Sequence, residues 1–144
     1  MEAPIYPLEA EARGMSESMI GIIFATHPAF ALLFSLLLGQ YMHGKGKKLM
    51  MMTGCILQSI GYLTYALMYW VQYDMYGLFL FLSIIGRIGS GVGAAVFLTP
   101  SYSLLPQFYR EDIQKKIMYF EIYSGLGVST GAIIASMLYR IGGY

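Results

Sequence analysis

Charged residues are scarce in this sequence. They make up 12% of its 144 residues, whereas 57% are hydrophobic and the mean hydropathy is +0.58. Soluble domains carry roughly 25% charged residues, so this chain has too few charges to cover the surface of a soluble fold of its size. The formal net charge of +1 also provides no basic face for nucleic acid. The composition therefore predicts a membrane protein whose surroundings are a lipid bilayer.

Cysteine is nearly absent, and so are the residue patterns of enzymes. The single cysteine, Cys55, excludes a disulfide within the chain and a cysteine-rich metal site. The sequence holds no nucleophile–base pair and no H-x-x-H or C-x-x-C arrangement. The glycine-rich run "GSGVGAA" at 89–95 lies inside an apolar segment, where a phosphate loop does not occur. We expect no enzyme activity, no metal and no cofactor.

Four long apolar runs stand out against this background. Crossing a bilayer core about 30 Å thick takes roughly 20 residues of helix, and the strands of a membrane barrel would be about half as long. The sequence predicts an all-α, multi-pass transmembrane bundle forming one partial transmembrane domain over 1–144. Its spans are expected at about 19–42, 49–71, 77–99 and 117–139.

The first 18 residues form a different kind of segment. They begin acidic and lack both the basic leader and the apolar centre of a signal peptide. We expect them to be a lead-in on the extracytoplasmic side of the membrane.

Lysine and arginine are distributed unevenly among the short connections, and this predicts sidedness. Basic residues of cytoplasmic loops set the orientation of membrane helices. Six of them lie in two connections, after the first and third spans: Lys45, Lys47, Lys48, Arg110, Lys115 and Lys116. The connection between spans two and three has Asp74 and no base. Both basic loops should face the cytoplasm, with both chain ends on the opposite side.

Four motifs in order give the sequence a family resemblance. Gly39-x-x-x-His43-Gly44-x-Gly46-Lys47-Lys48 resembles G-x-L-x-D-R-x-G-R-[RK], the loop signature between helices two and three of the major facilitator superfamily. "GRIGSGVGAA" at 86–95 is similar to the arginine-containing motif of the fourth helix. "EIYSGLGVSTGAIIASMLY" at 121–139 resembles the glycine pattern of the fifth, and 4–28 the stretch joining helices one and two.

The resemblance implies a secondary transporter with twelve membrane helices, of which this chain looks like helices two to five. It implies alternating access of a small organic solute, together with a coupled proton or ion, and a fragment that lacks most of its helices. Two departures concern the motifs themselves. His43 and Gly44 replace the aspartate and first arginine of the loop signature. In the fifth-helix pattern Ala132 replaces the proline, and Ala135 and Ser136 replace two glycines.

Arg87 is the one formal charge of the third predicted span. A charged side chain at the bilayer centre costs between about 2.5 and 17 kcal/mol, and such residues face a cavity or a partner. We expect Arg87 to handle the substrate or coupling ion, with a structural interhelical pair as the alternative.

Two further titratable residues are candidates for the same work. Glu121 is near the start of the fourth predicted span, where it is either a helix-dipole partner or a proton-linked or gating acid. His27 precedes Pro28 in the first predicted span. It either marks a kink with a satisfied ring or titrates as a coupling site.

Two sets of small and basic residues complete the expected site. By the resemblance, the loop residues Gly39, His43, Gly46, Lys47 and Lys48 gate the cytoplasmic side. Small residues spaced four apart let membrane helices approach closely, and these are Gly89, Gly93, Gly127, Gly131 and Ala135.

A second reading stays open beside the transporter. The chain would then be a self-contained four-helix membrane protein with a structural or regulatory role, dimeric through its glycine faces. The expected partners are the bilayer, a small solute, and either the missing helices of the same transporter or a second copy.

Overall fold

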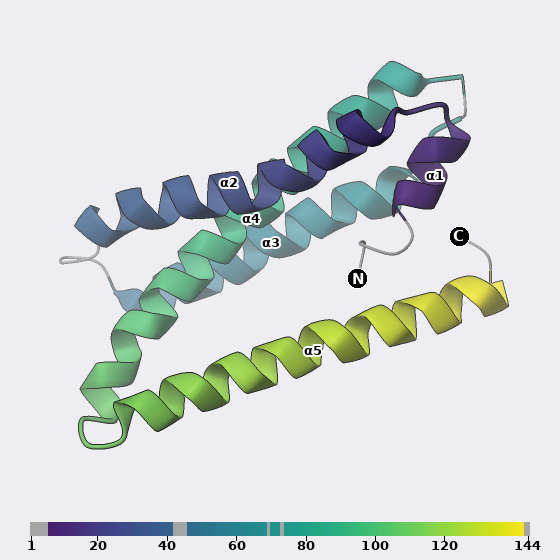
Figure 1. The fold of residues 1–144 in the computed structure, drawn as a ribbon. Coiled ribbons are helices and arrows are strands. Elements are labelled where there is room, and N and C mark those ends of the chain that lie inside the picture. Colours follow the sequence, from purple (N-terminus) through teal and green to yellow (C-terminus); the bar gives the residue numbers. More distant parts are fainter. Residues whose placement is uncertain (1–5, 42–45, 69, 73, 143–144) are drawn as a thin grey trace. The chain divides into compact units, whose positions relative to one another are not determined.

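The computed structural model describes residues 6–41, 46–68, 70–72 and 74–142. Five helices make up nearly all of this part of the chain (Figure 1). They are α1 (Tyr6–Ala12), α2 (Glu17–Tyr41), α3 (Lys47–Met68), α4 (Tyr76–Phe108) and α5 (Ile113–Gly142). These residues contain no strand, so the predicted all-α class is confirmed. The chain divides into two compact units. One is Gly21–Leu104, and the other combines Met1–Ile20 with Leu105–Tyr144.

Three of the described helices are long and apolar enough to cross a membrane: Glu17–Gln40, Tyr76–Phe108 and Ile113–Leu138. They correspond to the predicted spans 19–42, 77–99 and 117–139. The remaining predicted span, 49–71, is helical as α3 but is not among the three. Polar side chains such as Gln58, Ser59 and Thr64 interrupt the apolar sequence of α3, which lowers its hydropathy.

The acidic lead-in contains a short helix that the sequence did not predict. α1 is followed by Gly14, whose φ of 79° is a left-handed conformation that suits glycine. Around this turn the Gly14 amide donates to the Glu11 carbonyl at 2.9 Å, and the Met15 amide donates to the Ala10 carbonyl at 3.0 Å. These bonds satisfy carbonyls at the end of the helix. α1 has only seven residues, with Pro7 as the second of them. So short a segment shows too little periodicity of apolar residues to be recognised as a helix in a sequence.

α4 continues nine residues beyond the predicted limit of 99, through Pro100 and Pro106. Proline removes one backbone donor, and membrane helices tolerate it where side chains and neighbours compensate. The hydroxyls of Ser101 and Ser103 also donate to backbone carbonyls in this stretch, at 2.6 Å to Phe97 and at 2.9 Å to Pro100, which are not the carbonyls four residues before either proline. The predicted limit of 99 was therefore too early by nine residues.

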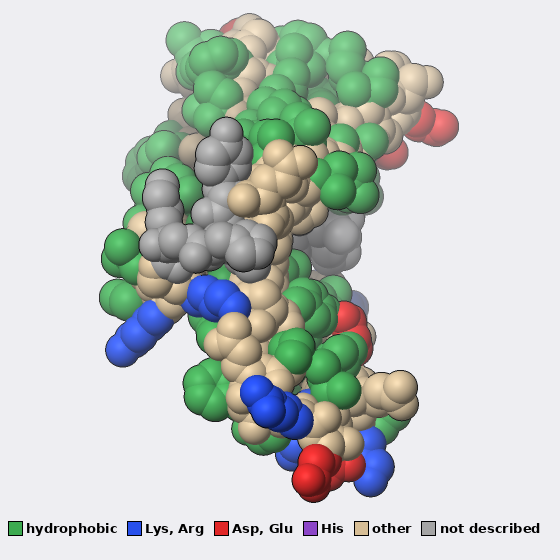
Figure 2. All heavy atoms as spheres, turned by 90° about the vertical axis from the view of Figure 1, so that its left-hand side faces the viewer, with side chains coloured by type: hydrophobic (Ala, Val, Ile, Leu, Met, Phe, Trp, Pro, Cys, Tyr) green, Lys and Arg blue, Asp and Glu red, His purple; other side chains and the backbone are tan. Residues whose placement is uncertain are grey.

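Most of α2, all of α3 and most of α4 form the unit Gly21–Leu104, and its core is small. The buried side chains of this unit include Ile23, Met68 and Phe79, with Ser83 and Ser90 among them. Large apolar side chains such as Leu36 and Leu63 are exposed. Figure 2 shows many hydrophobic side chains at the surface of the face that it draws, most densely toward the top of the view. Such an apolar surface is suited to contact with the lipid of a bilayer and is unfavourable in water.

Candidate functional site

Arg87 lies on α4 with only 9% of its surface exposed. Its guanidinium carbon is 4.1 Å from the ring centroid of Phe24 on α2 and 5.5 Å from that of Tyr65 on α3. The Tyr65 hydroxyl donates to the Ser83 carbonyl at 3.4 Å, which ties the ring to α4. Three helices therefore meet at this cation, and two of them present aromatic faces to it.

From the sequence, Arg87 was expected to face a cavity or a partner, and acidic residues are scarce in the unit Gly21–Leu104. Asp74 is its only aspartate or glutamate. It precedes the start of α4, and Arg87 lies roughly 16 Å along the helix axis from that start. The electron-rich faces of aromatic rings attract a guanidinium, by about 2 kcal/mol or more when it is desolvated. Cation–π contacts thus contribute to holding this buried cation.

His27 lies close to this cluster on α2. Its Nδ1 is 3.1 Å from the Ser90 hydroxyl oxygen on α4. The backbone is close as well, since a Cβ built on Gly91 would lie 2.5 Å from the His27 carbonyl oxygen. The ring has a hydrogen-bond partner, as one of the two sequence interpretations required. The structure thus brings His27 and Arg87 together in one three-helix cluster.

Glycines let α3 and α4 approach at backbone distance. A Cβ on Gly54 would lie 2.5 Å from the Phe97 amide nitrogen, and one on Gly61 would lie 2.5 Å from that of Ser90. From the α4 side, a Cβ on Gly86 would collide with the Thr64 hydroxyl and one on Gly93 with the Gln58 backbone. We call these four glycines the seam: Gly54, Gly61, Gly86 and Gly93. Only Gly93 of the seam was selected from the sequence.

Sequence reasoning missed the rest of the seam because it looked for glycines spaced four apart. In the seam, Gly54 and Gly61 are seven apart, as are Gly86 and Gly93, and this two-turn spacing was the available signal. Gly89, which was selected, makes a looser contact, with 3.6 Å between a Cβ built there and the Gly61 Cα.

The predicted gating loop is only partly described. His43 lies outside the described residues, as do Gly44 and Lys45. Gly39 lies on α2 in open space, and the Gly46 carbonyl accepts the amides of Leu49 and Met50 at the start of α3.

The two lysines of this loop differ in their contacts. The Lys47 ammonium donates to the Ser103 carbonyl of α4 at 3.3 Å, whereas Lys48 is exposed. Lys47 thus joins the start of α3 to the last turns of α4.

The other predicted residues belong to α5, in the second unit. Glu121 is exposed on its helix. Gly127 has nothing within 4 Å of a Cβ built on it, Gly131 is buried, and Ala135 is half-buried. A packing role for these three remains a prediction.

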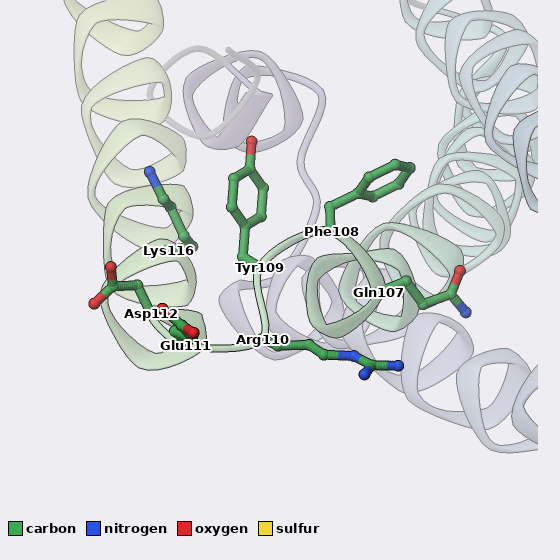
Figure 3. Close-up of a pocket in the computed structure, with 7 residues that line it drawn as sticks. All are labelled: Gln107, Phe108, Tyr109, Arg110, Glu111, Asp112 and Lys116. Atoms are coloured by element: carbon green, nitrogen blue, oxygen red, sulfur yellow. The ribbon is translucent and has the colours of Figure 1, made fainter.

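A cavity of about 460 Å³ lies where α4 ends and α5 begins (Figure 3). It is lined by Gln107, Phe108, Tyr109, Arg110, Glu111, Asp112 and Lys116. Lys115 and Asp112 form an exposed ion pair at 3.3 Å, and the Lys116 ammonium is 4.9 Å from the Tyr109 ring centroid. Figure 3 shows Lys116 and Tyr109 pointing the same way and Arg110 pointing elsewhere. The lining carries two basic and two acidic side chains, Arg110, Lys116, Glu111 and Asp112, so their formal charges cancel. Among the described residues no group of His, Cys, Asp or Glu could hold a metal ion.

Comparisons with known proteins complete the description of the site. The sequence model of a family described as "Major Facilitator Superfamily" matches residues 2–144. The mouse protein named MFS-type transporter SLC18B1 is 31% identical over 141 residues, covering 98% of this chain and 30% of the mouse protein. The human protein of the same name is 29% identical over the same length. The chain thus spans about 30% of the length of these curated relatives. No solved structure matches it.

Proposed function

Because the chain belongs to the Major Facilitator Superfamily, we propose that it is part of a secondary transporter that moves a small organic solute by alternating access. The chain is an integral, multi-pass membrane protein. It is not an enzyme, in keeping with relatives that are named as transporters. In alternating access, a binding site near the bilayer midplane is opened to each side in turn as the helices rock around it.

Within this proposal α3 is the fourth membrane span, and both basic loops are cytoplasmic. Its exposed Leu63 and Ile60 suit lipid, and its tight packing on α4, itself a candidate span, supports a shared path through the bilayer. Cysteine labelling from each side of intact cells, in a Cys55→Ala background, measures this topology. Reagents applied from outside should not label positions 45 or 115. Labelling from outside at either position would reverse the assignment.

The observation that supports a transport role most strongly is the buried guanidinium of Arg87. Arginine stays charged in proteins and cannot escape burial by losing a proton. Burying a charged guanidinium in a membrane helix costs solvation free energy. Charged residues that are retained there commonly mark a substrate or ion pathway. We propose that Arg87 binds an anionic group or biases a proton site. His27 and Glu121 are proposed as further substrate or coupling residues, and the loop that includes Lys47 is proposed to gate the cytoplasmic side.

The direct test is uptake of solute into liposomes. Purified residues 1–144 should take up none of a panel of radiolabelled organic solutes above the background of empty vesicles, because half of the cavity wall would be absent. A longer protein containing this segment should take up at least one of them. Uptake by the 144 residues alone would instead support a self-contained, dimeric membrane protein.

The reading frame gives an independent check. Apolar segments encoded upstream and downstream of these 144 codons would support the proposal that the chain is a segment of a longer transporter. In-frame stop codons on both sides would support the four-helix alternative.

A further inference from the structure

Ser90 connects the two basic groups of the α2–α3–α4 cluster. Its side chain is 1% exposed. The hydroxyl donates to the Arg87 carbonyl one turn earlier at 3.2 Å, and the same oxygen is 3.1 Å from Nδ1 of His27. A serine hydroxyl has one proton to donate and two lone pairs that accept. If the proton is directed to the Arg87 carbonyl, the oxygen accepts from the histidine ring.

The other serines in this chain support that direction of donation. Serine in a membrane helix commonly donates to a carbonyl three or four residues earlier. Ser83 does so to Phe79 at 2.8 Å and Ser101 to Phe97 at 2.6 Å. Ser90 follows the same pattern and in addition faces a histidine on a neighbouring helix.

Backbone packing keeps the ring in place. Gly91 allows the His27 carbonyl to approach α4, and the next residue, Pro28, fixes its own φ within α2. The ring is half-buried beside Ser90. The distance between Nδ1 and the hydroxyl is therefore set by the helix contact.

We propose that Ser90 is a positioning residue that holds neutral His27 as the Nδ1–H tautomer, which leaves the lone pair of Nε2 as a hydrogen-bond acceptor in the transport site. The tautomer of a neutral imidazole is set by the hydrogen bond that its other nitrogen makes. Nε2 would then accept from a solute group with a hydrogen to donate, such as a hydroxyl or an amide. The guanidinium of Arg87, stacked on Phe24 one turn before His27, disfavours an ammonium at this position.

The tautomer itself does not depend on transport, although its use does rest on the proposed function. The chain contains two histidines, so a His43→Gln variant leaves His27 as the only imidazole. Labelling that variant with ¹⁵N-histidine, in detergent micelles at a pH where the ring is neutral, gives one assignable pair of ring nitrogens. Long-range proton–nitrogen correlation then distinguishes the protonated nitrogen from the one with the lone pair.

We expect Nδ1 to be the protonated nitrogen in the His43→Gln protein. Ser90→Ala should shift the population toward Nε2–H, the tautomer that the neutral side chain of free histidine prefers in water. Ser83→Ala is the matched control, because its hydroxyl is also buried and bonded within α4. This control should leave the spectrum of His27 unchanged.

Two results would overturn the inference. Protonated Nε2 in the His43→Gln protein would mean that Ser90 donates to the ring, and this spectrum decides the matter even if Ser90→Ala fails to fold. An unchanged tautomer in a folded Ser90→Ala protein would remove Ser90 from its role. Neither readout requires uptake, so a failed transport assay would refute the proposed function and leave the tautomer result standing.

Discussion

α4 and α5 are both long, apolar and rich in small residues, yet they differ sharply in burial. In the most apolar stretch of α4 half of the residues are buried, whereas in that of α5 only 6% are. The seam glycines of α4 meet the backbone and side chains of α3, whereas Gly125 and Gly127 of α5 have nothing within 4 Å of a built Cβ. Similar composition thus accompanies two different situations.

The difference teaches what a glycine pattern can and cannot predict in a membrane helix. Small residues allow close approach because lipid provides no hydrophobic drive that would favour bulky contacts. Small residues indicate that another helix can pack closely against this one, but they do not identify which helix does so. In α4 the complementary glycines of α3 supply the partner. For α5 we propose that the remaining helices of the transporter do so.

The largest effect should come from adding one methyl group to the seam. Gly61→Ala places a Cβ 2.5 Å from the Ser90 amide nitrogen, so the two helices must separate. Overpacking of this kind typically costs about 1–3 kcal/mol. We expect the free energy of unfolding, measured by denaturant titration in micelles, to fall by about 3 kcal/mol, the upper end of that range, because the contacted atoms belong to the backbone.

Gly127→Ala is the matched control on α5. The added methyl enters open space, and alanine is a better helix former than glycine by about 1 kcal/mol. Its stability should stay the same or rise. Equal destabilisation by both substitutions would mean that α5 packs as closely as α4.

A smaller effect is expected from removing an aromatic face of the arginine cluster. Phe24→Leu keeps an apolar side chain but loses the ring 4.1 Å from the Arg87 guanidinium. A desolvated cation–π contact contributes about 2 kcal/mol, and the free energy of unfolding should fall by about that much. Phe81→Leu, at a side chain 59% exposed on the same unit, should change it by less than about 0.5 kcal/mol. Equal losses would show that the ring acts only through its apolar bulk.

The smallest effect concerns the two lysines at the start of α3. Lys47→Met removes the hydrogen bond to the Ser103 carbonyl, and a hydrogen bond of this kind contributes about 1 kcal/mol net. Lys48→Met removes an exposed charge of the same sign. Thermal unfolding in micelles should show a lower Tm for Lys47→Met only. If both variants unfold at the wild-type temperature, the hydrogen bond from Lys47 to α4 does not contribute to stability.

Much of the fold followed from the sequence, because long apolar runs have one stable form in lipid. Helices at all four expected positions appeared with ends within a few residues, apart from α4, which continues nine residues past its predicted limit. α1 could not be predicted, because seven residues carry little periodicity. The site was predictable in its cation but not in its partners. Arg87 stood out as a lone charge, whereas Phe24, Tyr65 and Ser90 resemble ordinary residues of an apolar helix until three helices are assembled.

The central claim is that Arg87 serves transport and not only packing, and uptake by a longer protein containing this segment tests it most directly. Arg87→Lys keeps the charge and loses the planar fork, and Arg87→Met keeps apolar bulk and loses both. We predict that both variants insert and express at wild-type levels, while uptake falls strongly with methionine and less with lysine. Wild-type uptake by a well-folded Arg87→Met protein would contradict the claim.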